Sequence, residues 1–248
     1  IGLGVASHGQ PLSERELVRL KALHLHHLRV DLLLSDPDYP VVLSHTAVEA
    51  GALGVPLEVA LLISDKGDEE LQQFKMALDQ TRPLVGAWLV YPAKEFFKGG
   101  SPTKEVVTLA RKHLAGYDPA ARFGTGTNTD FIFMQRTPPP VPRLDLVSFA
   151  ITPQVHAFDN ASMVETLEAQ AVAVASARRL AGGLPLIVSP VTLKPRFNPY
   201  ATGPVPQAPP DELPPQVDVR QMSLLGAGWT VGSLKYLAES SVHSVTYY

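Results

Sequence analysis

Short apolar segments alternate with helical patterns along the whole 248-residue chain, and this alternation limits the fold more than any other feature. Recurring strand–helix units build a parallel sheet, because each helix carries the chain back to begin the next strand in the same direction. The predicted strands are 1–7, 27–34, 56–63, 84–91, 121–128, 144–151, 184–193 and 242–248. Eight units in a chain of about 250 residues match a (β/α)8 barrel, the TIM-barrel architecture.

Helix-boundary residues support the same division of the chain. Ser13 and Glu16 have the spacing of a capping box at the start of a helix, and Pro102 and Gly116 have the positions typical of a helix start and end. The predicted helices are 11–23, 40–54, 67–81, 101–116, 162–183 and 218–240, the last one interrupted by Gly226 and Gly228. The proline-rich stretch 195–215 predicts an irregular loop.

An open, doubly wound sheet is the alternative to the barrel. No glycine-rich phosphate turn of the dinucleotide type follows the first strand, and polar residues recur at the carboxyl ends of nearly all the strands. Both features favour one barrel domain over residues 1–248. The chain begins inside an apolar segment and ends on a strand, so we expect a fragment of a longer multidomain chain, without the barrel's last helix and with its exposed flank covered by another segment.

The composition excludes several functional classes. Hydrophobic residues make up 45% and charged residues 18%, the net charge is −3, and there are no cysteines. Such a chain has no basic surface for nucleic acid, no polybasic membrane patch and no thiolate chemistry. No apolar run is long enough to cross a membrane. The lack of cysteine fits a reducing compartment, and we expect a cytoplasmic location.

Barrel enzymes carry their active sites at the carboxyl ends of the strands, so the polar residues there are the candidates for substrate binding. Arg29 and Asp31 alternate on one strand, and a buried ion pair is as good an interpretation of them as a binding role. The predicted substrate-binding residues are His8, Arg29, Asp31, Thr127, Asn128, Gln154, Thr192 and Tyr247. Among these, we expect Asn128 and Arg29 to bind hydroxyls or a ring oxygen.

Two segments contain the residue types that catalysis requires. In "ITPQVHAFDN" (151–160), polarity begins where the sixth strand ends, and His156 is the candidate general base because imidazole titrates near neutrality. Asp159 is a candidate to orient His156 or to cap the next helix. In "SPVTLKPRFNPYAT" (189–202), Lys194 and Arg196 are fixed cations suited to stabilising an oxyanion, a carboxylate or a phosphate.

No metal or cofactor is predicted. His24, His26 and His27 are close together in sequence, but their spacing matches neither a same-face helical pair nor a known zinc pattern. A surface or packing role is the better interpretation of these residues. The "GTGTN" segment (124–128) resembles a phosphate-binding turn, but glycines alone are weak support for such a site.

The two catalytic segments, together with "GTNTDF" and "LRVDLLL", resemble the D-apionate lactonase family over most of the chain. The resemblance implies a sugar-lactone hydrolase whose middle domain is a barrel related to glycoside hydrolases. It also implies a longer protein with β-rich parts before or after the barrel, and a small carbohydrate or sugar-lactone substrate.

The residues at the strand ends bear on the choice between these activities. A retaining glycosidase needs two carboxylates about 5 Å apart across its pocket. The fourth predicted strand ends in Tyr91-Pro92 and the seventh in "SPVT" (189–192), while Glu95 lies a few residues too far along. We therefore predict a metal-independent lactone hydrolase. The alternatives are a glycosidase-like barrel, which a carboxylate just past Tyr248 would favour, and a carbohydrate-binding barrel without catalysis.

Overall fold

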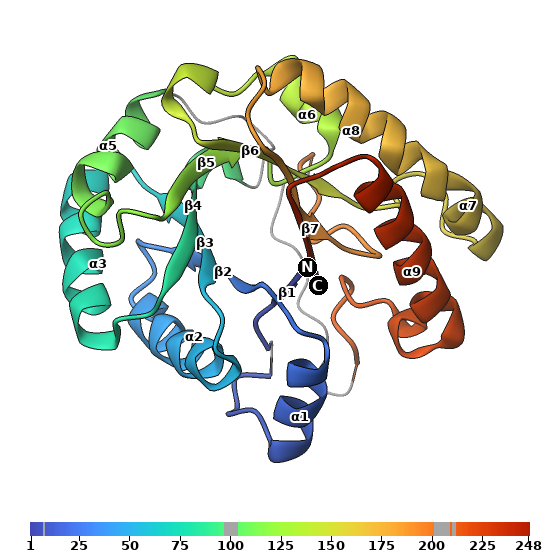
Figure 1. Cartoon of the computed structure of the whole chain (residues 1–248), viewed down its shortest axis with the longest axis horizontal. Coiled ribbons are helices and arrows are strands. Elements are labelled where there is room, and N and C mark those ends of the chain that lie inside the picture. Colours follow the sequence, from blue (N-terminus) through green and yellow to red (C-terminus); the bar gives the residue numbers. More distant parts are fainter. Residues whose placement is uncertain (7, 97–103, 201–208, 210–211) are drawn as a thin grey trace.

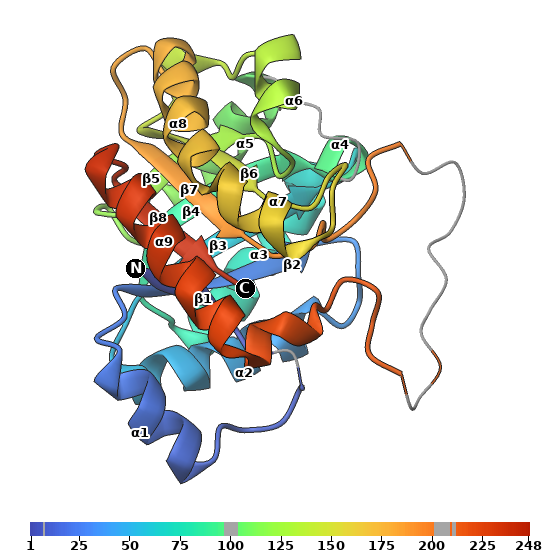
Figure 2. The same cartoon turned by 90° about the vertical axis from the view of Figure 1, so that its right-hand side faces the viewer.

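The protein folds into a closed ring of eight parallel strands (Figures 1 and 2), seen in a computed structural model that describes residues 1–6, 8–96, 104–200, 209 and 212–248. The strands are β1 (Gly2–Gly4), β2 (His27–Leu33), β3 (Leu57–Ile63), β4 (Val85–Pro92), β5 (Arg122–Gly126), β6 (Leu146–Ile151), β7 (Leu186–Val191) and β8 (Ser244–Tyr247).

Each strand pairs with its neighbours in chain order, and the pairing of β1 with β8 closes the ring. Gly2 of β1 lies opposite both His27 of β2 and Thr246 of β8. A Cβ atom at Gly2 would come within 2.1 Å of the His27 ring, so a larger residue does not fit where the ring closes. The predicted (β/α)8 barrel is confirmed, and the open sheet is excluded.

Helices surround the barrel (Figure 1). Those in the described residues are α1 (Glu14–Ala22), α2 (Tyr39–Leu53), α3 (Gly67–Thr81), α4 (Ala93–Phe96), α5 (Lys104–Leu114), α6 (Phe131–Arg136), α7 (Asn160–Glu165), α8 (Ala169–Leu180) and α9 (Leu224–Glu239), with short 3₁₀ turns η1 (Val141–Arg143), η2 (Thr166–Glu168) and η3 (Val219–Met222). None of these helices is long and apolar enough to span a membrane.

The structure corrects two of the predicted helices. Residues 162–183 do not form one helix, because η2 separates α7 from α8, and the Thr166 hydroxyl there donates to the Ser162 carbonyl at 2.7 Å. Helix α9 begins later than predicted, at Leu224, where Ser223 accepts from the Gly226 amide. It then continues through Gly226 and Gly228 without interruption.

Two predicted segments are described only in part. Helix α5 corresponds to the helix predicted over 101–116, whose first residues, Pro102 among them, lie outside the described residues. The predicted loop 195–215 forms no helix or strand in its described parts, 195–200, 209 and 212–215. The short helices α4 and α6 had no counterpart in the sequence prediction.

Apolar side chains form separate clusters on the two faces of the sheet. The outer cluster lies between the strands and the helices and includes Leu28, Val30 and Leu32 of β2. The intervening residues of β2 face the interior, because Arg29 contacts Ser189 of β7, a strand that is not a neighbour of β2. A smaller apolar cluster, which includes Leu62, Leu89, Tyr91 and Ile187, fills the β3–β7 side of the interior.

The outer cluster should dominate stability. Phe74 of α3 is fully buried and makes edge contacts with Trp88 at 5.9 Å and Tyr39 at 6.0 Å between ring centroids. We expect Phe74→Ala to lower the free energy of unfolding by about 3–5 kcal/mol, because it leaves a cavity. Met76→Ala on the exposed face of the same helix is the control. Urea unfolding measures both, and equal losses would contradict the assignment of the core.

Candidate active site

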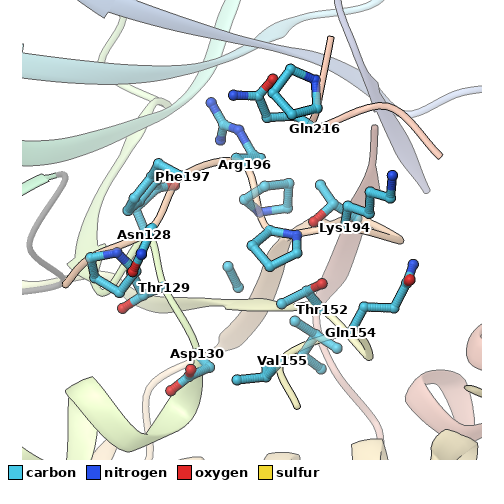
Figure 3. Close-up of a pocket in the computed structure, with 18 of the residues that line it drawn as sticks. Asn128, Thr129, Asp130, Thr152, Gln154, Val155, Lys194, Arg196, Phe197 and Gln216 are labelled. Atoms are coloured by element: carbon cyan, nitrogen blue, oxygen red, sulfur yellow. The ribbon is translucent and has the colours of Figure 1, made fainter. Parts of the chain in front are cut away.

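A cavity of about 650 Å³ opens at the carboxyl ends of β5, β6 and β7, where barrel enzymes carry their active sites (Figure 3). Six residues predicted from the sequence line it: Asn128, Gln154, Thr192, His156, Lys194 and Arg196. The apolar part of its wall includes Ile151, Phe158 and Phe197 together with several prolines. We call this cavity the β5–β7 pocket.

His156 lies exposed on the rim of the β5–β7 pocket, on the segment between β6 and α7. Asp159 does not orient it. The Asp159 carboxylate instead caps α7, accepting from the Ser162 amide at 2.9 Å and from the Ser162 hydroxyl at 2.7 Å. Of the two roles considered for Asp159, the structure shows the capping role, and no described side chain fixes the direction of the His156 imidazole.

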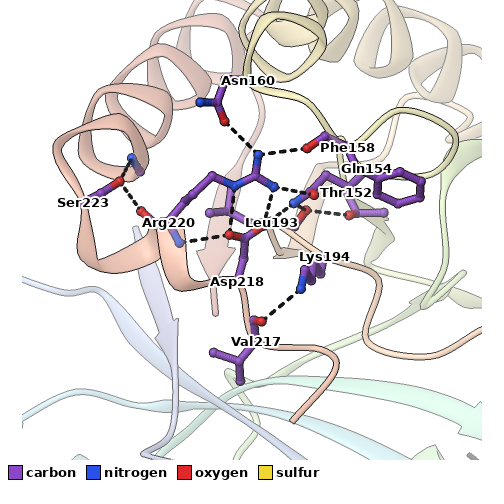
Figure 4. Close-up of polar contacts among 11 residues, drawn as sticks. Thr152, Gln154, Phe158, Asn160, Leu193, Lys194, Val217, Asp218, Arg220 and Ser223 are labelled. Carbon is purple, nitrogen blue, oxygen red and sulfur yellow. Dashed lines mark hydrogen bonds and ion pairs between the residues drawn. The ribbon is translucent and has the colours of Figure 1, made fainter. Parts of the chain in front are cut away.

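The side-chain amide of Gln154 is fully engaged in a buried network (Figure 4). Its Nε2 donates to the Leu193 carbonyl and to Asp218 Oδ2, both at 2.7 Å, and its Oε1 accepts from Arg220 Nη2 at 2.6 Å. Gln154 therefore joins the segment after β6 to two parts of the β7–β8 connection, Leu193 just after β7 and the Asp218–Arg220 segment before α9. Its polar atoms hold these segments together and do not point freely into the pocket.

Asp218 and Arg220 complete this network. Arg220 donates to both carboxylate oxygens of Asp218 and also to the Phe158 carbonyl and Asn160 Oδ1, at 2.9 Å each for the last two. These hydrogen bonds from Arg220 hold the pKa of Asp218 far below its usual value. The sequence prediction placed both residues in a helix and missed their role, because their partners lie about 60 residues earlier in the chain.

Lys194 and Arg196 occupy the same loop but have different surroundings. Lys194 Nζ donates to the Val217 carbonyl at 3.2 Å (Figure 4). Arg196 Nη2 forms an ion pair with Asp31, and the guanidinium lies 4.8 Å from the centre of the Tyr248 ring, a cation–π contact. Arg196 Nη1 is buried with no hydrogen-bond partner in the described residues.

A second buried network crosses the barrel interior next to the pocket, with Arg29 at its centre. Arg29 has 0% exposure and donates through Nε to Asp31 Oδ1 at 3.0 Å, through Nη1 to Ser189 Oγ at 2.8 Å and through Nη2 to Asn128 Oδ1 at 2.9 Å. Arg29 and Asp31 thus form the ion pair considered from the sequence. With its nitrogens engaged in this way, Arg29 is not part of the pocket lining and contacts the lining residue Asn128 from inside the barrel.

Glu58 on β3 belongs to this network and was missed from the sequence. It lies beside Arg29, with Oε1 3.7 Å from Nη1, and accepts a hydrogen bond from Ser189. Burial raises the pKa of Glu58. Burial alone would also raise the pKa of Asp31, but Arg196 and Arg29 lower it below its usual value. The sequence signal was a single acidic residue within the apolar run "PLEVALLI" (56–63).

The remaining predicted site residues lie outside the pocket lining or have structural partners. His8 is exposed near the start of α1 and accepts from the Gln10 amide at 3.0 Å. Thr127 is buried and shares a 2.6 Å hydrogen bond with the Thr129 hydroxyl. Thr192 lines the pocket, and its backbone amide donates to the Ile151 carbonyl.

Tyr247 points away from the barrel interior. Its side chain belongs to the outer apolar cluster, and its hydroxyl donates to Ser233 of α9 at 2.8 Å. The following residue, Tyr248, is 38% exposed and packs over Gly4, where an added Cβ atom would lie 2.7 Å from its ring. Partial burial, followed by the charge of Asp31, raises the pKa of Tyr248. The structure therefore places Tyr248, instead of Tyr247, beside Arg196.

Of the three histidines at positions 24, 26 and 27, His27 is buried and has a packing role. His27 lies inside the barrel with Nε2 2.7 Å from Thr246 Oγ1, and burial lowers its pKa to about 3. In the described residues, no group of three or more His, Cys, Asp or Glu side chains is arranged to hold a metal ion.

Comparisons with known proteins agree with this architecture. The sequence model of the "D-apionate lactonase, TIM barrel domain" family matches residues 1–248. The chain belongs to this family. D-apionate lactonase from Brucella anthropi is 34% identical over 101 residues, a match that covers 41% of this chain and 16% of that protein. The matched segment is thus a small part of the relative's length.

Solved structures with the same fold include several glycoside hydrolases. The family 53 catalytic domain of Ignisphaera aggregans gives a TM-score of 0.57 at 11% identity, with 99% of this chain and 83% of that chain covered. The family 51 α-L-arabinofuranosidase of Bifidobacterium longum gives 0.55 at 12% identity, with 99% and 65% covered. At such low identity these similarities concern the fold.

The Asp218–Arg220 pair should stabilise the loops around the pocket in a pH-dependent way. Because the pKa of Asp218 is lowered in the folded protein, its stabilising effect is present above the unfolded value of about 3.9 and is lost as the pH falls below it. We expect Asp218→Asn to lower the free energy of unfolding by about 2 kcal/mol at pH 7 and by less at pH 3. Urea unfolding at the two pH values is the measurement.

The exposed Asp79→Asn on α3 is the matched control, with an expected change within about 0.5 kcal/mol at pH 7. A loss for Asp218→Asn that stays constant between pH 7 and pH 3 would contradict the pKa argument.

Proposed function

We propose that this barrel hydrolyses the lactone of a small sugar acid in the β5–β7 pocket. The observation that carries the proposal is the combination of residues on the pocket wall: one imidazole at the rim, His156, faces a pocket that also contains the side chains of Asn128, Lys194 and Arg196. Lactone opening needs a base for water and donors for the tetrahedral oxyanion. Membership of the D-apionate lactonase family supports the same reaction class.

In the proposed reaction, a water oxygen attacks the lactone carbonyl carbon while its proton passes to the His156 imidazole. The carbonyl oxygen becomes an oxyanion, which Asn128 and Arg196 stabilise by hydrogen bonds, with Lys194 adding positive charge. The bond between the carbonyl carbon and the ring oxygen then breaks. The ring oxygen takes the proton from His156 and leaves as the hydroxyl of an open-chain hydroxy acid.

A glycosidase is the second candidate, because the structural neighbours include glycoside hydrolases. A retaining glycosidase requires two carboxylates that face the scissile bond. Among the described residues that line the pocket, Asp130 is the sole carboxylate, and its Oδ1 accepts from the Ile132 amide at the start of α6. The pocket composition therefore favours lactone opening. A binding barrel without catalysis is the third candidate.

A substrate screen separates these three functions. We expect hydrolysis of four- and five-carbon aldonolactones, measured as acid release at constant pH. We expect no release of nitrophenol from nitrophenyl glycosides. Turnover of an aryl glycoside without turnover of any lactone would contradict the proposal. Sugar binding with neither activity would indicate the third function.

His156→Ala tests the proposed base. Loss of a proton-transfer group should lower kcat on the best lactone by about 10²–10⁴, with a small effect on the melting temperature because the side chain is exposed. His45→Ala, an exposed histidine on α2, is the matched control and should retain full activity. If both variants are folded and equally active, His156 is not the base.

A further inference from the structure

Two residues that line the β5–β7 pocket carry buried hydrogen-bond donors without partners among the described residues. They are Asn128 Nδ2, on a side chain with 4% exposure, and Arg196 Nη1. Both residues line the pocket, and in Figure 3 Asn128 lies on the side opposite Lys194 and Gln154, with Arg196 at the top of the view. A buried donor left without a partner destabilises the folded protein, so such groups point to a ligand that supplies the missing acceptor.

The direction of the Asn128 amide is fixed by Arg29. A guanidinium group only donates hydrogen bonds, so Asn128 must present Oδ1 to Arg29 Nη2, which lies 2.9 Å away. Rotating the amide by 180° would place two donors against each other. The NH2 group of Asn128 is therefore held away from Arg29, as a donor.

Asp31 holds Arg196 in a corresponding way. Its Oδ1 accepts from Arg29 Nε and its Oδ2 pairs with Arg196 Nη2. One series of hydrogen bonds thus runs from Asn128 through Arg29 and Asp31 to Arg196, and at each end a donor has no partner within the described part of the protein. Glu58 and Ser189 contact Arg29 at Nη1, which is not the nitrogen that contacts Asn128. Glu58 and Ser189 therefore help to hold Arg29 in place without contacting Asn128.

We call the part of the pocket wall formed by Asn128 and Arg196 the floor of the pocket. A ligand that satisfies both of its unpartnered donors must offer hydrogen-bond acceptors at two points. A hydroxyl needs an acceptor for its own proton, whereas a carboxylate accepts with both oxygens and donates with neither. Hydrogen bonds between a carboxylate and a guanidinium are also among the strongest in proteins. The floor of the pocket therefore suits a carboxylate better than a sugar hydroxyl.

We infer that Asn128 and Arg196 form a carboxylate site that holds the open-chain polyhydroxy acid after ring opening, an inference that rests on the proposed function. Arg29 is then a positioning residue, which acts through Asn128 and Asp31. The acid should compete with the lactone for the pocket. This series of hydrogen bonds orders Asn128 and Arg196 before the acid binds, so less conformational entropy is lost on binding.

Isothermal titration with D-ribonate and with ribitol tests the site, because the two five-carbon probes differ in the carboxylate alone. We expect D-ribonate to bind the protein at least about tenfold more tightly than ribitol. Asn128→Asp keeps an acceptor for Arg29 but replaces the NH2 donor by a negatively charged oxygen. It should weaken D-ribonate binding by at least about tenfold and leave ribitol binding within about twofold.

Asn198→Asp is the matched control. Asn198 is exposed, lines the same pocket and accepts from the Tyr200 amide at 2.9 Å, which an aspartate also does. It adds the same charge at the pocket rim and should change D-ribonate binding by no more than about twofold. Arg196→Gln is a second variant, which removes the other donor from a loop. It should also weaken D-ribonate binding by at least about tenfold.

The outcomes separate this site from the proposed function. Equal weakening by Asn128→Asp and Asn198→Asp, or equal affinity for D-ribonate and ribitol, overturns the carboxylate site. If lactones are hydrolysed but D-ribonate does not bind, the carboxylate site is wrong and the proposed function stands. If D-ribonate binds as expected but no lactone is opened, the site stands and the proposed function is wrong.

Discussion

The buried guanidinium of Arg29 is the interaction on which the organisation of the site depends. A positive charge with 0% exposure is tolerated inside a barrel only if hydrogen-bond acceptors surround it. Asp31, Ser189 and Asn128 provide these acceptors from the strands β2 and β7 and from the end of β5. Burial by itself would lower the pKa of Arg29, but Asp31, Tyr248 and Glu58 outweigh burial and raise it. Arg29 therefore stays charged and determines how these side chains are oriented.

The fold was predictable from the sequence because its signal is repeated and local. Each strand is an apolar run and each long helix has its own boundary residues, so one misjudged boundary does not change the architecture. Where the prediction was wrong, an interaction outside the local pattern decided the structure. Gly226 in α9 is an example, because a Cβ atom there would come within 2.2 Å of the Arg220 carbonyl oxygen. The break between α7 and α8 is a local feature that the periodicity did not reveal, with the Thr166 hydroxyl bonded to the Ser162 carbonyl at the break.

The site was only partly predictable, since its geometry depends on contacts between distant segments. The alternation of Arg29 and Asp31 indicated that both face the interior, and they do. Glu58 was missed because an acid in an apolar run reads as part of a strand, and its partner Ser189 is 131 residues away. Tyr247 and Tyr248 show the limit of strand periodicity, because a shift of one residue exchanges the two faces. The amide of Gln154 looked available from the sequence, but Asp218 and Arg220 engage it.

The two polar networks have different relations to the pocket, and this difference bears on how a lactone would be oriented. In the Gln154–Asp218–Arg220 network the polar groups bond to one another, so this network fixes the loops that carry His156 and Lys194. In the Arg29 network the terminal donors on Asn128 and Arg196 have no partner among the described residues. The acyl group of a substrate is therefore expected to lie at the floor, against these donors, and the polyol portion toward the rim. On the proposed mechanism, water then approaches from the open side of the pocket, where the exposed imidazole of His156 is placed to take its proton.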